Sequence, residues 1–211
     1  MGGIGIGEGD CCWGKEFAEQ KIFTSKIYPS RVRSIEITTT YDTLYYSKGH
    51  TAMKIKYYIG RPGVGKSTLV RKAMEQLGPG ELVKEGLVVY HKFPKSKTIV
   101  LGIYDEAVFS GTDRWSKGVG PKFRAWLEDA EQRFPDWTII GEGERLSNNP
   151  NLDAMFATED MELLHVTVSE ETLKQRHEGR GEAQSESWQK GMATRIQNLC
   201  NKYPHTVVIN E

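Results

Sequence analysis

The segment Gly60-Arg-Pro-Gly-Val-Gly-Lys-Ser67 constrains the fold of this chain more than any other part of the sequence. It fits the pattern G-x-x-x-x-G-K-[ST] without an exception, and it lies between a run of β-forming residues, 54–59, and a helical segment, 66–77. In that setting the glycines let backbone N–H groups converge on a phosphate at the start of the helix. The sequence therefore predicts a nucleotide-binding loop made of Gly60, Arg61, Pro62, Gly63, Val64, Gly65, Lys66, Ser67 and Thr68.

Two side chains of this loop are expected to act on the phosphates directly. The Lys66 ammonium has the charge and the reach to bridge the β- and γ-phosphates, and the Ser67 hydroxyl is an oxygen ligand suited to Mg²⁺. A nucleoside triphosphate is therefore the expected binding partner, with ATP and Mg²⁺ as the expected cofactors. The loop alone does not distinguish ATP from GTP.

The rest of the chain alternates between strand-like and helix-like segments from Met53 onward. Strands are predicted at 54–59, 87–93, 98–104, 137–141, 163–168 and 206–209, and helices at 66–77, 121–134, 152–156, after Ser169, and at 188–201. This alternation predicts an α/β fold with a parallel sheet covered by helices on both faces. Residues 53–211 are expected to form this domain. Residues 1–52 differ from this domain in composition and pattern, and they are interpreted as a flexible extension with a short strand at 33–39.

Composition excludes several other kinds of protein. Lys and Arg total 28 and Asp and Glu total 28, and this zero balance argues against a protein that coats nucleic acid non-specifically. No apolar run approaches the ~18 residues of a membrane span, so no membrane partner is expected. The three cysteines, Cys11, Cys12 and Cys200, form no C-x-x-C pair, so neither a disulfide framework nor a zinc site is indicated and a cytoplasmic location is expected. His165, within an apolar strand, is interpreted as a packed histidine.

Within the phosphate-loop proteins, the sequence favours small kinases. The guanine-reading pattern N-K-x-D and the γ-phosphate sensor D-x-x-G are both missing from the sequence, and motor ATPases and helicases are usually larger. A kinase needs an acid near the metal, a group that orients or deprotonates the acceptor, and cations that shield the transferred charge.

Acidic residues at predicted strand ends are the candidates for the first two roles, because ligands of a parallel sheet bind there. Glu142 follows the strand 137–141 and is our candidate metal ligand, whereas Glu144 and Arg145 are placed to reach substrate. Asp113 is our candidate for the group that acts on the acceptor, with Asp105 in reserve. Ordinary solvated loop acids would give the same pattern.

Arg176 and Arg180 are the candidates for the shielding cations. They are four residues apart and share one helix face, beside Gly179 and Gly181, as in a lid that closes over the phosphates. A solvated charged helix face is the alternative interpretation.

Several of these segments also resemble a known family. Leu101-Gly-Ile-Tyr-Asp105, Gly111-Thr-Asp-Arg-Trp-Ser116, Gly141-Glu-Gly-Glu-Arg-Leu-Ser-Asn148 and the stretch from Arg176 to Ile196 are similar to small phage-associated phosphate-loop kinases, among them the 5-hydroxymethyluracil DNA kinases of thymidine hypermodification. The resemblance covers about residues 53–211. It implies a P-loop NTPase fold of the nucleoside-monophosphate-kinase type and a hydroxymethyl group on a DNA base as acceptor. Two positions depart from the family pattern, which has leucine at Trp115 and aspartate at Glu144.

A DNA acceptor would have to be unstacked, and this sets a further expectation. Trp115 would stack on the base, while Arg114 and Arg124 would contact the DNA backbone. Two alternatives remain open at this stage. One is a kinase of a free nucleoside monophosphate or another small alcohol, and the other is an ATPase or nucleotide-binding regulator that transfers no phosphoryl group.

Overall fold

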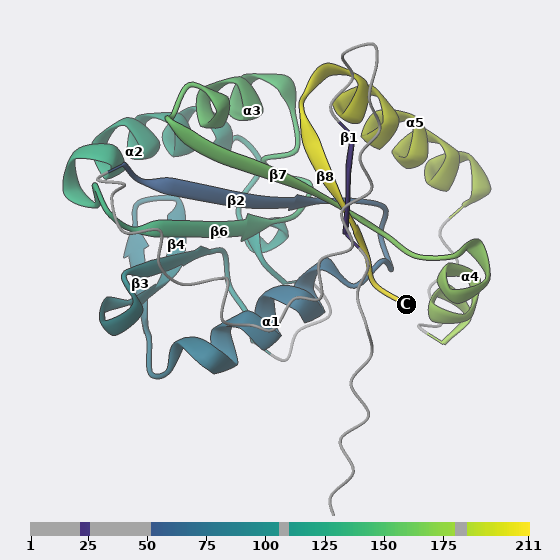
Figure 1. The fold of residues 1–211 in the computed structure, drawn as a ribbon, viewed down its shortest axis with the longest axis horizontal. Coiled ribbons are helices and arrows are strands. Elements are labelled where there is room, and N and C mark those ends of the chain that lie inside the picture. Colours follow the sequence, from purple (N-terminus) through teal and green to yellow (C-terminus); the bar gives the residue numbers. More distant parts are fainter. Residues whose placement is uncertain (1–21, 26–51, 106–109, 180–184) are drawn as a thin grey trace, which may run out of the picture.

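The computed structural model describes residues 22–25, 52–105, 110–179 and 185–211 (Figure 1). In these residues eight strands form one sheet in the order β1-β8-β7-β2-β6-β5-β4-β3. The strands are β1 (Ile22–Ser25), β2 (Lys54–Ile59), β3 (Glu81–Glu85), β4 (Val88–Phe93), β5 (Thr98–Leu101), β6 (Thr138–Glu142), β7 (Asp160–Thr167) and β8 (His205–Ile209). The helices are α1 (Lys66–Leu77), α2 (Val119–Arg133), α3 (Asn149–Phe156), α4 (Glu170–Glu178) and α5 (Glu186–Lys202), with short 3₁₀ turns at Pro94–Ser96 and Thr112–Arg114.

The centre of the sheet is parallel, as predicted. β5 pairs with β6, β6 with β2, β2 with β7, and β7 with β8, all in parallel register. Because parallel strands end at one edge of a sheet, the phosphate loop after β2 lies beside the ends of β6, β7 and β8. This edge carries the site described below.

Helices cover both faces of the sheet, which confirms the predicted α/β architecture. On one face α2, α3 and α5 bury a large apolar cluster that includes Tyr57, Phe123 and Leu163. On the other face α1 packs Val70 and Leu77 against Phe93, Val100 and Ile140. Figure 1 shows α1 on the opposite side of the sheet from α2 and α3.

One end of the sheet is antiparallel. The predicted strands 87–93 and 98–104 pair as a hairpin, with Tyr90 opposite Leu101, although β5 ends at Leu101. Gly102 follows with φ of 103°, and an added Cβ there would lie 2.1 Å from the Gly111 backbone, so the chain turns away at this point. β3 was not predicted. Its sequence, Glu-Leu-Val-Lys-Glu, is that of an exposed edge strand in which charged residues outnumber apolar ones.

The other end of the sheet includes residues from the segment 1–52. β1 pairs with β8 in antiparallel register, with Ile22 opposite Val208 and Ser25 opposite His205. Four residues of the expected extension are therefore part of the sheet edge. The strand expected at 33–39 lies outside the described residues.

The helix starts follow local capping chemistry. The Ser169 side chain accepts the N–H of Thr172 and begins α4, whose first turn holds Glu170 and Glu171, as predicted. Asn148 and Ser185 cap α3 and α5 in the same way. None of the helices in the described residues combines the length and apolar character that crossing a membrane requires.

Candidate functional site

The phosphate loop has the backbone geometry that its glycines predict. Gly60, Gly63 and Gly65 have φ of 150°, 91° and 91°. A Cβ on Gly60 would lie 2.5 Å from the Val166 carbonyl oxygen, and one on Gly65 would lie 2.3 Å from the Asn210 amide nitrogen. Side chains at these positions would therefore strain the backbone, and they would collide with the β7 backbone at Gly60 and with the Asn210 side chain at Gly65.

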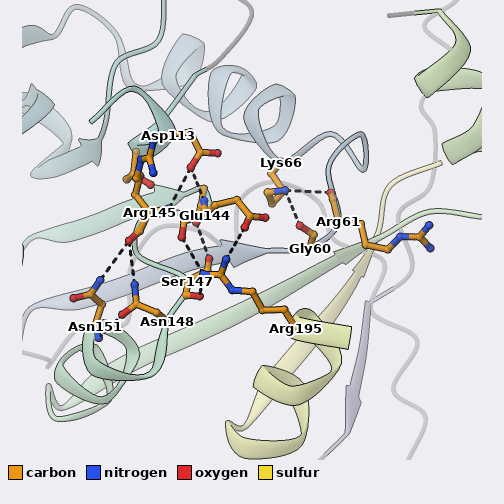
Figure 2. A network of polar contacts seen from close by, with 12 residues as sticks. Gly60, Arg61, Lys66, Asp113, Glu144, Arg145, Ser147, Asn148, Asn151 and Arg195 are labelled. Carbon is orange, nitrogen blue, oxygen red and sulfur yellow. Dashed lines mark hydrogen bonds and ion pairs between the residues drawn. The ribbon is translucent and has the colours of Figure 1, made fainter. Parts of the chain in front are cut away.

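Lys66 begins α1 and lies back over the loop. Its Nζ donates to the carbonyl oxygens of Gly60, at 2.8 Å, and Arg61, at 3.2 Å (Figure 2). The N-cap, Gly65, makes no side-chain cap, so backbone N–H groups at the helix start are placed for an anion. The ammonium and the helix start thus form one positively charged surface.

Ser67 and Glu142, the two residues expected to bind a metal ion, meet beside this surface. The Ser67 hydroxyl donates to Glu142 Oε1 at 2.9 Å, and the Glu142 side chain lies at the end of β6 with the residue 1% exposed. Burial raises the pKa of Glu142 to about 7, while the Lys66 ammonium and the Ser67 hydroxyl act in the opposite direction.

The surroundings of Glu142 fit a hard divalent cation. A hydroxyl and a carboxylate are the oxygen ligands that Mg²⁺ prefers, and an ion there would offset the cost of burying the ionised carboxylate. The Tyr104 hydroxyl is buried beside Glu142, and its pKa is raised by burial first and then by the Glu142 charge. Ser67 and Glu142 are the residues that would hold Mg²⁺.

Asp113 fixes the loop that follows Glu142. Its Oδ1 accepts the backbone N–H groups of Glu144, at 2.6 Å, and Arg145, at 3.2 Å. The adjacent Thr112 hydroxyl donates to the Glu142 carbonyl oxygen at 2.8 Å. The segments Gly111–Ser116 and Gly141–Asn148, which carry the family resemblance, are thus in direct contact.

Glu144 extends from this loop toward Lys66 and is held by Arg195 from α5 (Figure 2). Arg195 Nη1 lies 3.1 Å from Glu144 Oε2, and its Nη2 donates to the carbonyl oxygens of Ser147, at 2.6 Å, and Glu144, at 3.3 Å. Burial raises the pKa of Glu144, whereas Arg195 and Lys66 oppose that shift. Sequence reasoning missed Arg195, because a single arginine within a helix carries no local signal of a partner 51 residues away.

Arg145 and Arg124 support the same loop. The Arg145 carbonyl oxygen accepts the side-chain amides of Asn148 and Asn151, and Arg124 donates to Asn151 Oδ1 at 2.9 Å. The Arg145 side chain donates to the Trp115 carbonyl oxygen at 3.2 Å. Both arginines, expected to contact substrate, make these contacts within the chain.

The expectation that Trp115 stacks on a base is wrong. The residue is 3% exposed, belongs to the main apolar cluster, and donates its indole N–H to the Val89 carbonyl oxygen at 3.1 Å. It stands in a polar segment of the sequence, but the chain folds that segment back over α2, where the Phe123 ring lies against the indole. A buried indole has no face left for a nucleobase.

Arg114 and Asp105 lie together at the surface. Arg114 Nη1 donates to Asp105 Oδ1 at 2.7 Å, and both side chains are substantially exposed. The reserve acid is therefore paired with a residue that was expected to bind DNA. Arg71, on α1, donates to the Asp105 carbonyl oxygen and to Ser110 from the other side.

α4 lies against the phosphate loop, as expected of a lid. Arg176 donates to the carbonyl oxygens of Val64, at 3.3 Å, and Asn210, at 3.1 Å, and His177 Nε2 lies 2.9 Å from the Pro62 carbonyl oxygen. Arg61 forms an ion pair with Glu170 in the first turn of α4. Arg176 is thus within reach of the loop that would hold phosphates, whereas Arg180 lies outside the described residues.

Two shallow pockets flank this arrangement. One, of about 250 Å³, lies between the loop residues Arg61 and Val64, the end of β7, and α4 and α5. The other, of about 400 Å³, lies between α5 and the loop after β6, and Arg195, Ser147 and Asn148 line it. Arg195 therefore holds the Glu144 carboxylate through Nη1 and also lines this pocket.

Comparison with known proteins agrees with this geometry. The chain matches the family model P-loop Nucleotide Kinase3 over residues 51–208, which includes every strand from β2 to β7 and most of β8. Among curated proteins, none matches the chain. Because the match extends over most of the chain and includes the phosphate loop, the chain belongs to the P-loop Nucleotide Kinase3 family and is a P-loop kinase-like protein.

Proposed function

We propose that this protein transfers the γ-phosphoryl group of ATP to an alcohol oxygen of a nucleotide. The observation that carries the proposal is the contact between Ser67 and the buried Glu142 carboxylate, beside Lys66 on a phosphate loop. A loop, a cation and a hard-metal ligand pair in one place are the parts of a phosphoryl-transfer site. The family assignment supports the same reaction class.

In the proposed mechanism, the chain's own cations hold the triphosphate. Lys66 would exchange its bonds to the Gly60 and Arg61 carbonyl oxygens for bonds to the β- and γ-phosphates, and Arg176 would turn from the Val64 carbonyl to the same charge. Mg²⁺, when bound at Ser67 and Glu142, supplies further neutralisation of the phosphate oxygens. Because the transition state is loose, such positioning and charge stabilisation account for most of the acceleration.

Asp113 is the proposed group that orients the acceptor. Its Oδ1 is occupied by two backbone N–H groups, whereas Oδ2 accepts no hydrogen bond from the described part of the chain. The acceptor oxygen would form its bond to the γ-phosphorus as the bond to the ADP oxygen breaks, and its proton would pass to Asp113. Glu144, near Lys66 and with a raised pKa, is the second carboxylate in reach.

For the acceptor we propose the hydroxymethyl group of 5-hydroxymethyluracil in DNA. The support is that Gly111–Ser116 and Gly141–Asn148, similar to segments of the DNA kinases, form one unit through Asp113. The base would enter in single-stranded or flipped form, at a cost of a few kcal/mol. Since Trp115 is buried, it cannot stack on the base. In this proposal the base binds instead in the pocket that Arg195 lines.

A free nucleoside monophosphate is the second candidate acceptor. In its favour, Arg114 and Arg124 pair within the chain, and the chain has zero net charge, so no strong attraction for polymeric DNA is built in. A small acceptor would also need no stacking residue.

The test measures which acceptor receives the labelled phosphoryl group of γ-labelled ATP. It compares single-stranded DNA containing 5-hydroxymethyluracil, the matched thymine DNA, and free 5-hydroxymethyl-deoxyuridine monophosphate. The proposal expects label in the first DNA and none in the second. Label only in the free nucleotide would replace DNA with the second candidate, and label only in inorganic phosphate would identify an ATPase that transfers nothing.

The role of Asp113 has its own test. Asp113→Asn keeps an oxygen for the two loop N–H groups but cannot take a proton, whereas Asp113→Ala loses both. The proposal expects turnover to fall ~10²-fold or more in both variants with ATP affinity little changed. If Asp113→Asn kept near-normal turnover while Asp113→Ala did not, Asp113 would only hold the loop and would not act on the acceptor.

A further inference from the structure

Three potential metal ligands come together outside the phosphate site. His165 on β7, Cys200 on α5 and His205 at the start of β8 each offer one ligand atom, and these atoms all lie within 4.8 Å of one another. The sequence has no His/Cys pattern of metal-ligand spacing, because these residues are 35 and 5 positions apart and only the sheet register joins them. Their convergence is a product of the fold.

The register explains why the two histidines share a side of the sheet. β7 and β8 pair in parallel with Leu164 opposite Thr206, which places His205 opposite Leu163. Because strand side chains alternate, His205, Leu163 and His165 project to one face. Leu163 packs in the apolar cluster with Leu199 and Cys200, so this is the face that α5 covers.

The distances suit a tetrahedral metal. For zinc, bond lengths of about 2.3 Å to sulfur and 2.0–2.1 Å to nitrogen imply a sulfur–nitrogen separation of ~3.6 Å. Cys200 Sγ lies 3.4 Å from His165 Nδ1. The ligand atom of His205 lies within 4.8 Å of the other two, so it needs to shift by at most on the order of 1 Å, which a half-buried side chain can do by rotating.

The surroundings prepare these groups for ligation. His205 Nδ1 lies 3.1 Å from the Tyr203 carbonyl oxygen, a hydrogen bond that places the ring proton on Nδ1 and leaves Nε2 as a ligand. His165 lines the pocket of about 250 Å³ beside the phosphate loop, which gives an ion a path from solvent. The His165 and His205 rings lie edge to face with their centroids 5.8 Å apart, so neither ring covers the face of the other completely.

We propose that His165, Cys200 and His205 form a binding site for one Zn²⁺ ion, with water in the fourth position. Nitrogen and sulfur donors select a borderline-soft ion such as Zn²⁺ over Mg²⁺, which prefers oxygen. On binding, the Cys200 thiol releases its proton to water, and the thiolate sulfur forms the bond to Zn²⁺. The ion would join the last turn of α5 to β7 and β8, one and a half helical turns from Arg195.

Cobalt titration of the full-length protein tests the site, because Co²⁺ replaces Zn²⁺ and gives a sulfur-to-metal charge-transfer band. The proposal expects this band at one equivalent of Co²⁺ and its displacement by Zn²⁺. Cys200→Ser should remove the band, and His165→Asn and His205→Asn should each weaken the affinity at least ~10-fold. The matched control, Cys11→Ser/Cys12→Ser, should keep both band and affinity.

The unfolding temperature gives a second readout. Zn²⁺ should raise it in the wild type and in Cys11→Ser/Cys12→Ser, but not in Cys200→Ser. If Cys200→Ser fails to fold, the Cys11→Ser/Cys12→Ser protein carries the test, since Cys200 is then its one thiol. A band that survives in Cys200→Ser, no band in the wild type, or unchanged affinity in both histidine variants would overturn the proposal.

Discussion

The Ser67 hydroxyl donates a 2.9 Å hydrogen bond to the Glu142 carboxylate, and so joins the start of α1 to the end of β6 across 75 residues of sequence. Glu142 is buried, and Lys66 and Asp113 contribute opposite charges to its surroundings. Burial of the ionised carboxylate lowers stability, and Lys66 offsets only part of this cost, because the pKa of Glu142 is still raised to about 7. The contact therefore makes the metal-binding role of Glu142 testable.

Glu142→Gln should abolish Mg²⁺-dependent turnover, because the amide keeps the shape of the side chain but is a poor magnesium ligand. In chelator at pH 8, where the carboxylate is ionised, the variant should be more stable than the wild type by on the order of 1–3 kcal/mol. The sign follows from the pKa of about 7, which lies above the ordinary 4.5, so the folded state binds more protons and wild-type stability falls as pH rises between these values. Urea unfolding at pH 5 and pH 8 measures this, with the exposed Glu128→Gln on α2 as control.

Arg195→Ala should lower kcat ~10–100-fold while KM for ATP changes little. Arg195 touches neither the phosphate loop nor Lys66 in the contacts described above, but it holds Glu144 and the Ser147 carbonyl. Its loss leaves a half-buried carboxylate unpaired in the acceptor loop, so the defect should be in positioning. Steady-state kinetics of Arg195→Ala and of the exposed Lys190→Ala on the same helix make the comparison. A rise in KM for ATP alone would assign Arg195 to nucleotide binding.

Trp115→Ala should lower the free energy of unfolding by ~3–5 kcal/mol, because the substitution removes a large side chain from the main core and an indole hydrogen bond to the Val89 carbonyl oxygen. Trp115→Phe keeps most of the side-chain volume, so it should lower the free energy of unfolding by less than Trp115→Ala does. Chemical denaturation of both variants checks this order. A stable Trp115→Ala protein with a selective loss of DNA phosphorylation would restore the stacking role.

Glu85→Gln should reduce the free energy of unfolding by about 1 kcal/mol at pH 7, since the Glu85 carboxylate accepts from Arg133, Tyr90 and Trp126 and is only partly shielded from water. These hydrogen bonds, Arg133 first, lower the pKa of Glu85 from 4.5 to about 2. A lowered pKa means stability that is present above 4.5 and is lost as pH falls toward 2. The difference in free energy of unfolding between Glu85→Gln and the wild type should therefore shrink below pH 4.5. The exposed control Glu81→Gln should unfold with nearly the wild-type free energy at any pH.

Local patterns predicted the parts of this fold that local chemistry determines. The phosphate loop, the Ser169 cap and the buried strand before Glu142 each depend on neighbours within a few residues, and all three are present. The pairing of Ser67 with Glu142 was predictable as well, because the ends of parallel strands share one edge of the sheet.

Contacts across the fold could not be predicted in this way. The burial of Trp115 depends on Val89 and Phe123 from other elements, and a polar sequence neighbourhood gave the opposite indication. Arg195 became part of the site only when α5 packed beside the loop after β6. The His165, Cys200 and His205 cluster required the register of β7 and β8, which no pattern in the sequence specifies.

Transfer of labelled phosphate from γ-labelled ATP, measured for the wild type and Lys66→Ala, tests the central claim most directly. Lys66 is a half-buried side chain at the start of α1 that belongs to none of the apolar clusters, so the variant should fold, as should the control Lys72→Ala on the exposed side of α1. We predict that the wild type and Lys72→Ala label an acceptor that carries a hydroxymethyl group, and that folded Lys66→Ala labels none. Near-normal transfer by Lys66→Ala would contradict the assignment of this loop as the centre of phosphoryl transfer.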